Sequence, residues 1–224
     1  MIKLLQTVSL LAATLTTGLM AGLFAAFSYA VMPGLARSHD RTFVEAMQRI
    51  NVAIINGWFM VCFLGGLAFT VAALVLHLST GRELLPWIIA ALVLYAVMFV
   101  VTSAVNVPLN DQLAKAGQPG DIADLAAVRH AFEARWVTWN IVRTVANVAA
   151  FAALTWALVL HGRVTATPAP TPAPGAAGAT QAAPYGQAPH GAAPYGQAMP
   201  YTRAAPYGQA PHRAAPYGQA PGGW

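Results

Sequence analysis

Four long apolar segments, separated by short polar stretches, dominate the first 160 residues of the chain. They cover approximately residues 4–32, 52–78, 86–105 and 136–160, and each reaches the ~20 residues that an α-helix needs to cross a bilayer. The first segment is also longer than the ~7–15 apolar residues of a typical signal peptide, so we interpret it as a retained helix. The pattern predicts an all-α, integral membrane protein in which residues 1–163 form an up-down four-helix bundle.

Three polar or proline-containing positions predict where these helices begin and end. Met32-Pro33-Gly34 is expected to close the first helix. Pro108, within Asn106-Val-Pro-Leu-Asn110, is expected to stop or kink the third. Asp121 is expected to cap the helix that leads into the fourth apolar segment.

The chain changes character after residue 163. Residues 164–180 consist mainly of Ala, Pro, Thr and Gly, and the segment Ala-Ala-Pro-Tyr-Gly-Gln-Ala then recurs four times. Such a composition cannot bury enough apolar surface to offset the entropy of ordering. We therefore predict that residues 164–224 are a disordered tail, which could recruit protein partners.

A polar stripe runs into the fourth apolar segment. Its members are three or four residues apart, a spacing that places them on one helix face. They are Arg129, Glu133, Trp136, Asn140, Arg143 and Asn147. Polar and charged side chains within a membrane-spanning helix need partners or a water-filled cavity, and they indicate a functional site by default.

Further amide side chains are expected at the same end of the bundle. Gln48, Asn51 and Asn56 share one broad face where the second span begins, and Asn106 and Asn110 flank Pro108 where the third span ends. Together with the stripe, they predict a single polar pocket that opens toward loops one and three. The alternative is that these residues only hold the helices together, with each hydrogen bond contributing roughly 0.6 kcal/mol.

Composition and charge exclude several classes of function. Only 8% of residues are charged, against about 25% in soluble domains, and the net charge of +5 is too dispersed to indicate nucleic-acid binding. Cys62 stands alone, which excludes an intramolecular disulfide and a cysteine-based metal cluster. His77 and His161 could meet at one membrane face and ligate haem, but we favour two interfacial histidines. We therefore predict no bound metal or cofactor.

The distribution of basic residues predicts the orientation. Six of them are expected in or beside loops one and three, whereas the other ends of the spans carry three. The first set is Arg37, Arg41, Arg49, Lys115, Arg129 and Arg135, and the second is Lys3, Arg82 and Arg163. The positive-inside rule then predicts a multi-pass protein of the cell (plasma) membrane with loops one and three in the cytoplasm.

Five segments carry a resemblance to a known family. They are Gly22–Ser28, Val31–Leu35, Ala46–Asn51, Asn106–Asn110 and Phe132–Thr144. Over about residues 10–160 the chain resembles the anthrone oxygenase-like family of small four-span membrane proteins. The Asn-x-Pro-x-Asn and Arg-Trp-x-x-Trp-Asn-x-x-Arg-Thr elements are the most specific parts of the match. The resemblance implies oxidation of polyketide anthrones to anthraquinones by molecular oxygen, without a bound cofactor.

That chemistry suggests roles for the stripe. Glu133 and His130 are the available bases, and Arg143 with Asn140 would stabilise the enolate oxygen of the substrate. Trp136 would stack on a flat aromatic ring. The remaining residues expected to bind a small lipophilic or aromatic substrate, which could arrive through the bilayer, are Gln48, Asn51, Asn56, Asn106, Asn110 and Arg129. The alternative function is a non-catalytic membrane scaffold whose tail recruits partners.

Overall fold

The computed structural model describes residues 1–79 and 82–166, and within these ranges all regular secondary structure is helical. Four helices are long and apolar enough to cross a membrane: Ile2–Ala36, Gly57–His77, Leu85–Lys115 and Leu125–Thr165. This confirms the all-α class and the four spans of a multi-pass membrane protein. The predicted disordered tail lies outside the described residues from position 167 onward.

The first helix continues past Pro33. It consists of α1 (Ile2–Ala26), a π-helical turn η1 (Phe27–Val31) and α2 (Met32–Ala36). Proline has no N–H to donate, and its ring would clash with the carbonyl of Tyr29, four residues earlier. The wider π-turn before Pro33 makes room for the ring, so the helix ends at Ala36 and not at the proline.

The third helix passes its proline in the same way. α5 (Leu85–Val101) leads into a second π-helical turn, η2 (Thr102–Asn106), and then into α6 (Val107–Lys115), whose first turn contains Pro108. π-turns within α-helices are rare and are found frequently at functional sites. Both π-turns in the described part of the chain end shortly before a proline, Pro33 or Pro108.

The second apolar segment contains a break. α3 (Asp40–Ala53) ends before Asn56, and α4 (Gly57–His77) starts directly after it. The Asn56 side chain accepts a hydrogen bond from the backbone N–H of Phe59 at 3.1 Å and so caps α4. The segment predicted as one span therefore enters the bundle only at Gly57.

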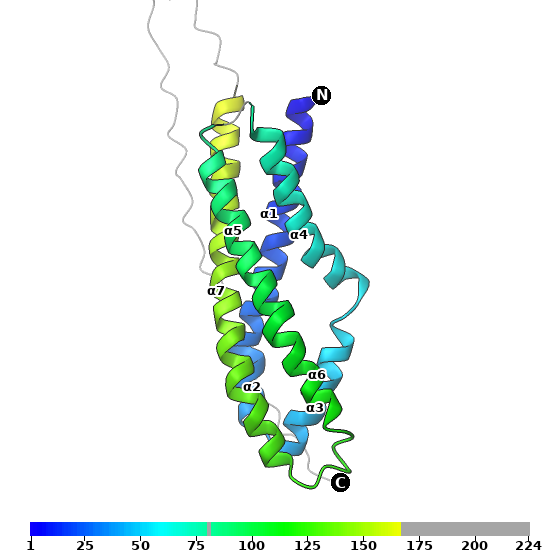
Figure 1. The fold of residues 1–224 in the computed structure, drawn as a ribbon. Helices are drawn as coiled ribbons and strands as arrows, with labels where there is room; N and C mark the ends of the chain where they lie inside the picture. Colours follow the sequence, from blue (N-terminus) through cyan, green and yellow to red (C-terminus); the bar gives the residue numbers. More distant parts are fainter. Residues whose placement is uncertain (80–81, 167–224) are drawn as a thin grey trace, which may run out of the picture. The chain divides into compact units, whose positions relative to one another are not determined.

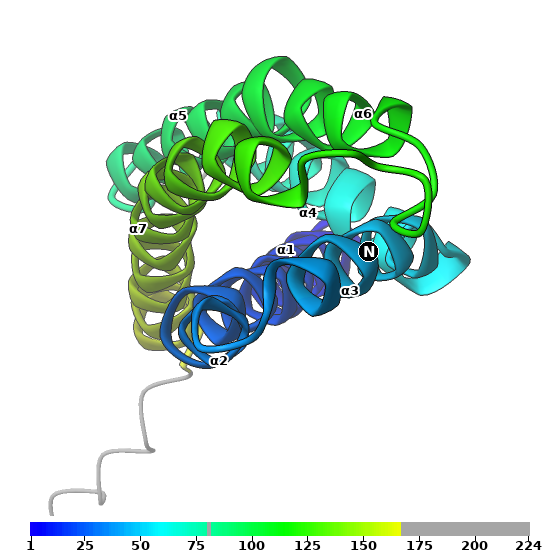
Figure 2. The same ribbon diagram turned by 90° about the horizontal axis from the view of Figure 1, so that it is seen from below.

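α7 (Leu125–Thr165) is the longest helix, with 41 residues. Its cap is Asp124 and not Asp121, because Asp124 Oδ1 accepts a hydrogen bond from the N–H of Ala127 at 2.9 Å. α1 packs against α4 and α7, and α5 packs against α7 and α4. Consecutive spans run in opposite directions, as predicted (Figure 1), and Figure 2 shows them around a common core.

Three buried apolar clusters follow one another along the bundle. One is built around Leu10, Ile88 and Leu154 near the N-terminal end of α1. A central cluster contains Tyr95, and a third contains Phe43 and joins α3 and α6 to the first part of α7. The candidate site lies between the central cluster and this third cluster.

Candidate functional site

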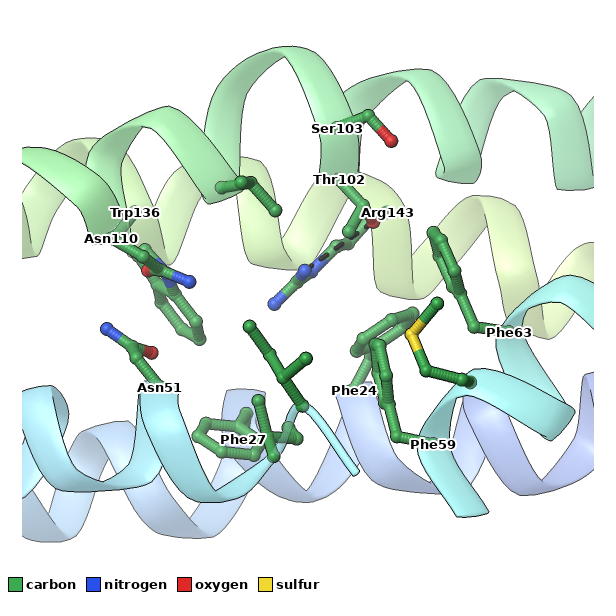
Figure 3. Close-up of a pocket in the computed structure, with 14 residues that line it drawn as sticks. Phe24, Phe27, Asn51, Phe59, Phe63, Thr102, Ser103, Asn110, Trp136 and Arg143 are labelled. Carbon is green, nitrogen blue, oxygen red and sulfur yellow. Dashed lines mark hydrogen bonds between the residues drawn. The ribbon is translucent and has the colours of Figure 1, made fainter. Parts of the chain in front are cut away.

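A cavity of about 230 Å³ lies where α1, the α3–α4 break, η2 and α7 face one another. Figure 3 shows its walls and the side chains that converge on it. The lining residues are Phe24, Phe27, Asn51, Ile54, Ile55, Phe59, Met60, Phe63, Thr102, Ser103, Val107, Asn110, Trp136 and Arg143. Both π-turns contribute to the lining, η1 through Phe27 and η2 through Thr102 and Ser103.

Aromatic rings form much of the cavity wall. The rings of Phe59 and Phe63 stack at a centroid distance of 5.3 Å, and Phe63 stacks in turn on Phe99 at 4.8 Å. On the opposite side, the rings of Phe27 and Trp136 lie 5.7 Å apart. Small-molecule sites are typically concave and mostly apolar, with a few placed polar groups, and this lining has that character.

Arg143 brings a cation to this apolar cavity. Its side chain is only 6% exposed, and its guanidinium carbon lies 4.2 Å from the centroid of the Phe24 ring and 5.2 Å from that of Trp136. Within residues 1–79 and 82–166, no carboxylate forms a salt bridge with Arg143. A buried, unpaired cation is costly, and cation–π contacts offset only part of that cost.

Asn140 fixes the position of Arg143. The amide nitrogen of Asn140 donates to Ser28 Oγ at 2.8 Å and to the backbone oxygen of Phe24 at 3.2 Å. The amide oxygen is thereby turned toward Arg143 and accepts a hydrogen bond from its Nε at 2.9 Å. A longer contact of 3.5 Å joins Arg143 Nη1 to Thr102 Oγ1 (Figure 3). All these acceptors are neutral, so the charge stays uncompensated.

The Asn-x-Pro-x-Asn element holds Trp136. Asn106 donates from Nδ2 to the backbone oxygen of Trp136 at 3.3 Å, and the indole Nε1 of Trp136 donates to Asn110 Oδ1 at 2.8 Å. The two most specific elements of the resemblance therefore meet at one tryptophan. Asn51 faces the same cavity from α3, and its buried Nδ2 has no hydrogen-bond partner. That amide is available to a ligand.

Comparison with protein families bears on this arrangement directly, because the anthrone oxygenase family model matches residues 59–153. Over these residues the chain is anthrone oxygenase-like. The match begins in the first turn of α4, ends within α7, and includes Asn110, Trp136 and Arg143. No curated protein and no solved structure matches the chain.

The remaining predicted site residues of this anthrone oxygenase-like protein lie outside the cavity. Arg129 donates to Glu133 at 2.6 Å and to Asp40 at 2.9 Å, and it also donates to the backbone oxygens of Ser38 and Ala36. These contacts join the start of α7 to the α2–α3 connection. The structure thus places Arg129 and Glu133 in an ion-pair network.

Gln48, Asn56 and His130 are also separate from the cavity lining. Gln48 Nε2 donates to the backbone oxygens of Leu113 and Gly117, at 2.9 and 3.0 Å, and so joins α3 to the end of α6. Asn56 caps α4. His130 borders a shallow surface depression together with Glu133. Of the predicted site residues, the structure brings Asn51, Asn110, Trp136 and Arg143 to the cavity, with Asn106 and Asn140 behind them.

The phenylalanines that line the cavity from α1, η1 and α4 were not predicted as part of the site. Phe24, Phe27, Phe59 and Phe63 stand in apolar segments, where the sequence cannot distinguish a cavity wall from a packed core. Only Thr102 carried a signal, because it shares a face with Asn106 in the sequence pattern. Among the described residues of this anthrone oxygenase-like protein, no three His, Cys, Asp or Glu side chains are grouped as a metal site requires.

Proposed function

We propose that the cavity binds a small, lipophilic aromatic molecule that carries an acidic group, and that the protein oxidises this molecule with molecular oxygen. The substrate class is a phenolic or enolisable polycycle of the anthrone type. Support comes from the anthrone oxygenase family match and from four helices that can span a membrane. The family resemblance implies that the reaction proceeds without a bound cofactor.

The observation that carries this proposal is the cation in the cavity wall. Placing an arginine at the centre of a spanning helix costs about 2.5–3.5 kcal/mol on insertion scales. No carboxylate among the described residues compensates Arg143. A bound organic anion would neutralise it, while its flat rings would pack between Trp136 and the phenylalanines.

The proposed chemistry assigns one main role to Arg143. An anthrone methylene is acidified by the neighbouring carbonyl and the two flanking rings, and loss of its proton places negative charge on the carbonyl oxygen. Arg143 stabilises that oxyanion, since a preorganised cation next to the developing negative charge favours the ionised form. The carbanion then reduces oxygen and combines with it, and protonation gives a hydroperoxide at the former methylene carbon. Loss of water leaves a carbonyl, so one anthrone and one dioxygen give one anthraquinone and one water.

For the group that accepts the substrate's proton, the geometry favours a different assignment from the one that the sequence suggested. Glu133 and His130 were predicted as bases, but neither lines the cavity. Glu133 is held by Arg129 at 2.6 Å. We propose that ionisation beside Arg143 needs no side-chain base and that the proton passes to water.

The α3–α4 break offers access from the bilayer. Ile55 lines the cavity and is 68% exposed on the outer surface of the helices, where lipid would lie. A lipophilic substrate could therefore enter beside the break without crossing an aqueous phase. We further propose a plasma-membrane location with loops one and three in the cytoplasm, supported by the excess of basic residues in those loops.

The test is oxygen uptake by purified protein in lipid nanodiscs with a hydroxylated anthrone, corrected for the protein-free rate of autoxidation. Wild-type protein should consume one dioxygen per anthraquinone formed. Arg143→Met should lose about 100-fold or more of the rate, the loss typical of removing an oxyanion-stabilising donor. Glu133→Gln should stay within about twofold of wild type, because Glu133 does not reach the cavity.

Arg135→Ala is the matched control, since Arg135 is an exposed arginine of the same helix. Wild-type protein that adds nothing to autoxidation across several hydroxylated aromatics would refute the oxygenase proposal. A loss of about 100-fold in Glu133→Gln would restore Glu133 as the base. The alternative of a non-catalytic scaffold depends on the tail, which lies outside the described residues, and deletion of residues 167–224 tests it by partner capture.

A further inference from the structure

Two buried histidines face each other at the end of the bundle opposite the cavity. His77 is the last residue of α4, and His161 lies in the last turns of α7; they are 2% and 6% exposed. Their rings meet edge to face with centroids 5.3 Å apart, and His77 Nε2 lies 3.4 Å from His161 Nδ1. The apolar cluster around Leu10, Ile88 and Leu154 lies next to this pair and separates it from the cavity.

The outer nitrogens of the two rings have defined partners. His77 Nδ1 lies 2.7 Å from the backbone oxygen of Ala73, and a carbonyl can only accept, so this nitrogen carries a hydrogen. His161 Nε2 lies 2.9 Å from the hydroxyl oxygen of Thr7. That hydroxyl is also 3.0 Å from the backbone oxygen of Lys3. Thr7 can therefore donate in either of two directions.

With both rings neutral, one arrangement satisfies every group. The Thr7 hydroxyl donates to His161 Nε2, His161 Nδ1 donates to His77 Nε2, and His77 Nδ1 donates to Ala73. The chain of hydrogen bonds then ends on a carbonyl.

One added proton leaves the network equally satisfied. If the Thr7 hydroxyl rotates to the backbone oxygen of Lys3, its oxygen can accept from a protonated His161 Nε2. His161 Nδ1 still donates to His77, so the extra charge arrives without the loss of a hydrogen bond.

We propose that His77 and His161 form a binding site for a single proton, with the hydroxyl of Thr7 as the rotor that allows the neutral and the singly protonated state. The positive charge would lie on His161, in the last turns of α7 and beside the C-terminal end of α4, and a helix C-terminus stabilises a cation. A second proton is disfavoured, because the two facing nitrogens would both be donors at 3.4 Å.

The described surroundings supply no counter-charge, and two cations, Lys3 and Arg163, lie within about one turn of Thr7 and His161. From α1 the pair meets Thr7, and the neighbouring Gln6 donates to the backbone oxygen of Leu76 at 2.7 Å. On α7 the guanidinium of Arg163 lies over the Trp156 ring at 5.7 Å. The side facing α5 is apolar, and no described carboxylate forms a salt bridge with either histidine.

The site would respond to the pH of the aqueous phase next to this end of the bundle. Because its members come from α1, α4 and α7, protonation would change how three of the four spans are joined. His77 and His161 do meet, as the sequence analysis considered when it weighed haem ligation.

The test is a titration of full-length protein with ¹⁵N-labelled histidine in lipid nanodiscs, followed by NMR of the ring nitrogens between about pH 8 and pH 5. The signals are assigned with His77→Gln and His161→Gln. We expect the two rings to take up one proton together, with a common midpoint. In Thr7→Val the protonated fraction at about pH 6 should fall several-fold, because the outer N–H of the cation loses its acceptor. Thr7→Ser keeps the hydroxyl and should match wild type.

Three results would overturn the proposal. One is a pair that stays neutral throughout the range, or rings that each bind a proton independently. Another is a Thr7→Val titration that superimposes on wild type. The third is a stoichiometric metal ion in the purified protein that is lost in His161→Gln, since a metal would then occupy the space between the rings. None of these results depends on oxygenase activity.

Discussion

Arg129 and Arg143 stand on the same face of α7 and have opposite environments. Arg129 donates to two carboxylates and two backbone oxygens, and its guanidinium lies over the Phe43 ring. Arg143 has the neutral acceptors Asn140 and Thr102, two aromatic rings and a cavity in front of it. Charge balance thus distinguishes an arginine that joins helices from one that can receive a ligand.

Loss of the unpaired arginine should produce the largest effect on binding. In Arg143→Met we expect the affinity for a lipophilic aromatic anion to fall about 100-fold. The variant lacks the buried positive charge, and a charge-assisted contact contributes about 1.5–3 kcal/mol to binding. The unfolding temperature should stay unchanged or rise, because a buried unpaired charge is replaced by an apolar side chain. Quenching of tryptophan fluorescence and thermal unfolding in nanodiscs measure the two quantities. A large fall in unfolding temperature would instead make Arg143 a structural residue.

The compensated arginine should show the reverse pattern, with a smaller effect. Arg129→Met leaves Asp40 and Glu133 without their partner, so we expect unfolding to become easier by about 1.5–3 kcal/mol. Affinity for the anion should change less than about twofold, because the cavity does not include Arg129. The same two assays apply. Equal losses of affinity in both variants would remove the distinction between the two arginines.

The smallest effect is expected where the cavity wall is supported by a single neutral hydrogen bond. Asn110→Ala removes the acceptor of the Trp136 indole and should cost about 1 kcal/mol in stability and about fivefold in affinity. Asn56→Ala is a useful comparison, since it removes a helix cap outside the cavity lining. Asn56→Ala is expected to lose about as much stability as Asn110→Ala, whereas its affinity for the anion should not change. A silent Asn110→Ala would show that Trp136 is held by packing alone.

The sequence by itself determined the parts of this protein that depend on hydrophobicity and helical spacing. Four apolar segments predicted four spans, since length and composition suffice to place a helix in a bilayer. The spacing of Trp136, Asn140 and Arg143 predicted a common buried face. The Asn-x-Pro-x-Asn and Arg-Trp-x-x-Trp-Asn-x-x-Arg-Thr elements pointed to the family that the comparison then supported.

Local geometry around polar residues was harder to predict. Pro33 and Pro108 were expected to end or bend helices. Instead, a π-turn before each proline makes room for its ring, and the helix continues. Asp121 and Asp124 are both acceptable caps in sequence, and only the backbone path selects Asp124. Asn56, which the sequence predicts to bind substrate, stands directly before Gly57 and caps α4, a role that the sequence pattern did not indicate.

Only the tertiary structure decided which polar side chains neutralise one another. Arg129, Glu133 and Arg143 share one helix face, but Asp40 arrives from α3 beside Arg129, and no carboxylate arrives beside Arg143 among the described residues. The aromatic walls likewise come from α1 and α4, whose apolar sequence does not distinguish a cavity from a core. Helical periodicity fixes the face on which a residue lies, whereas its charge partners depend on contacts between helices that are distant in sequence.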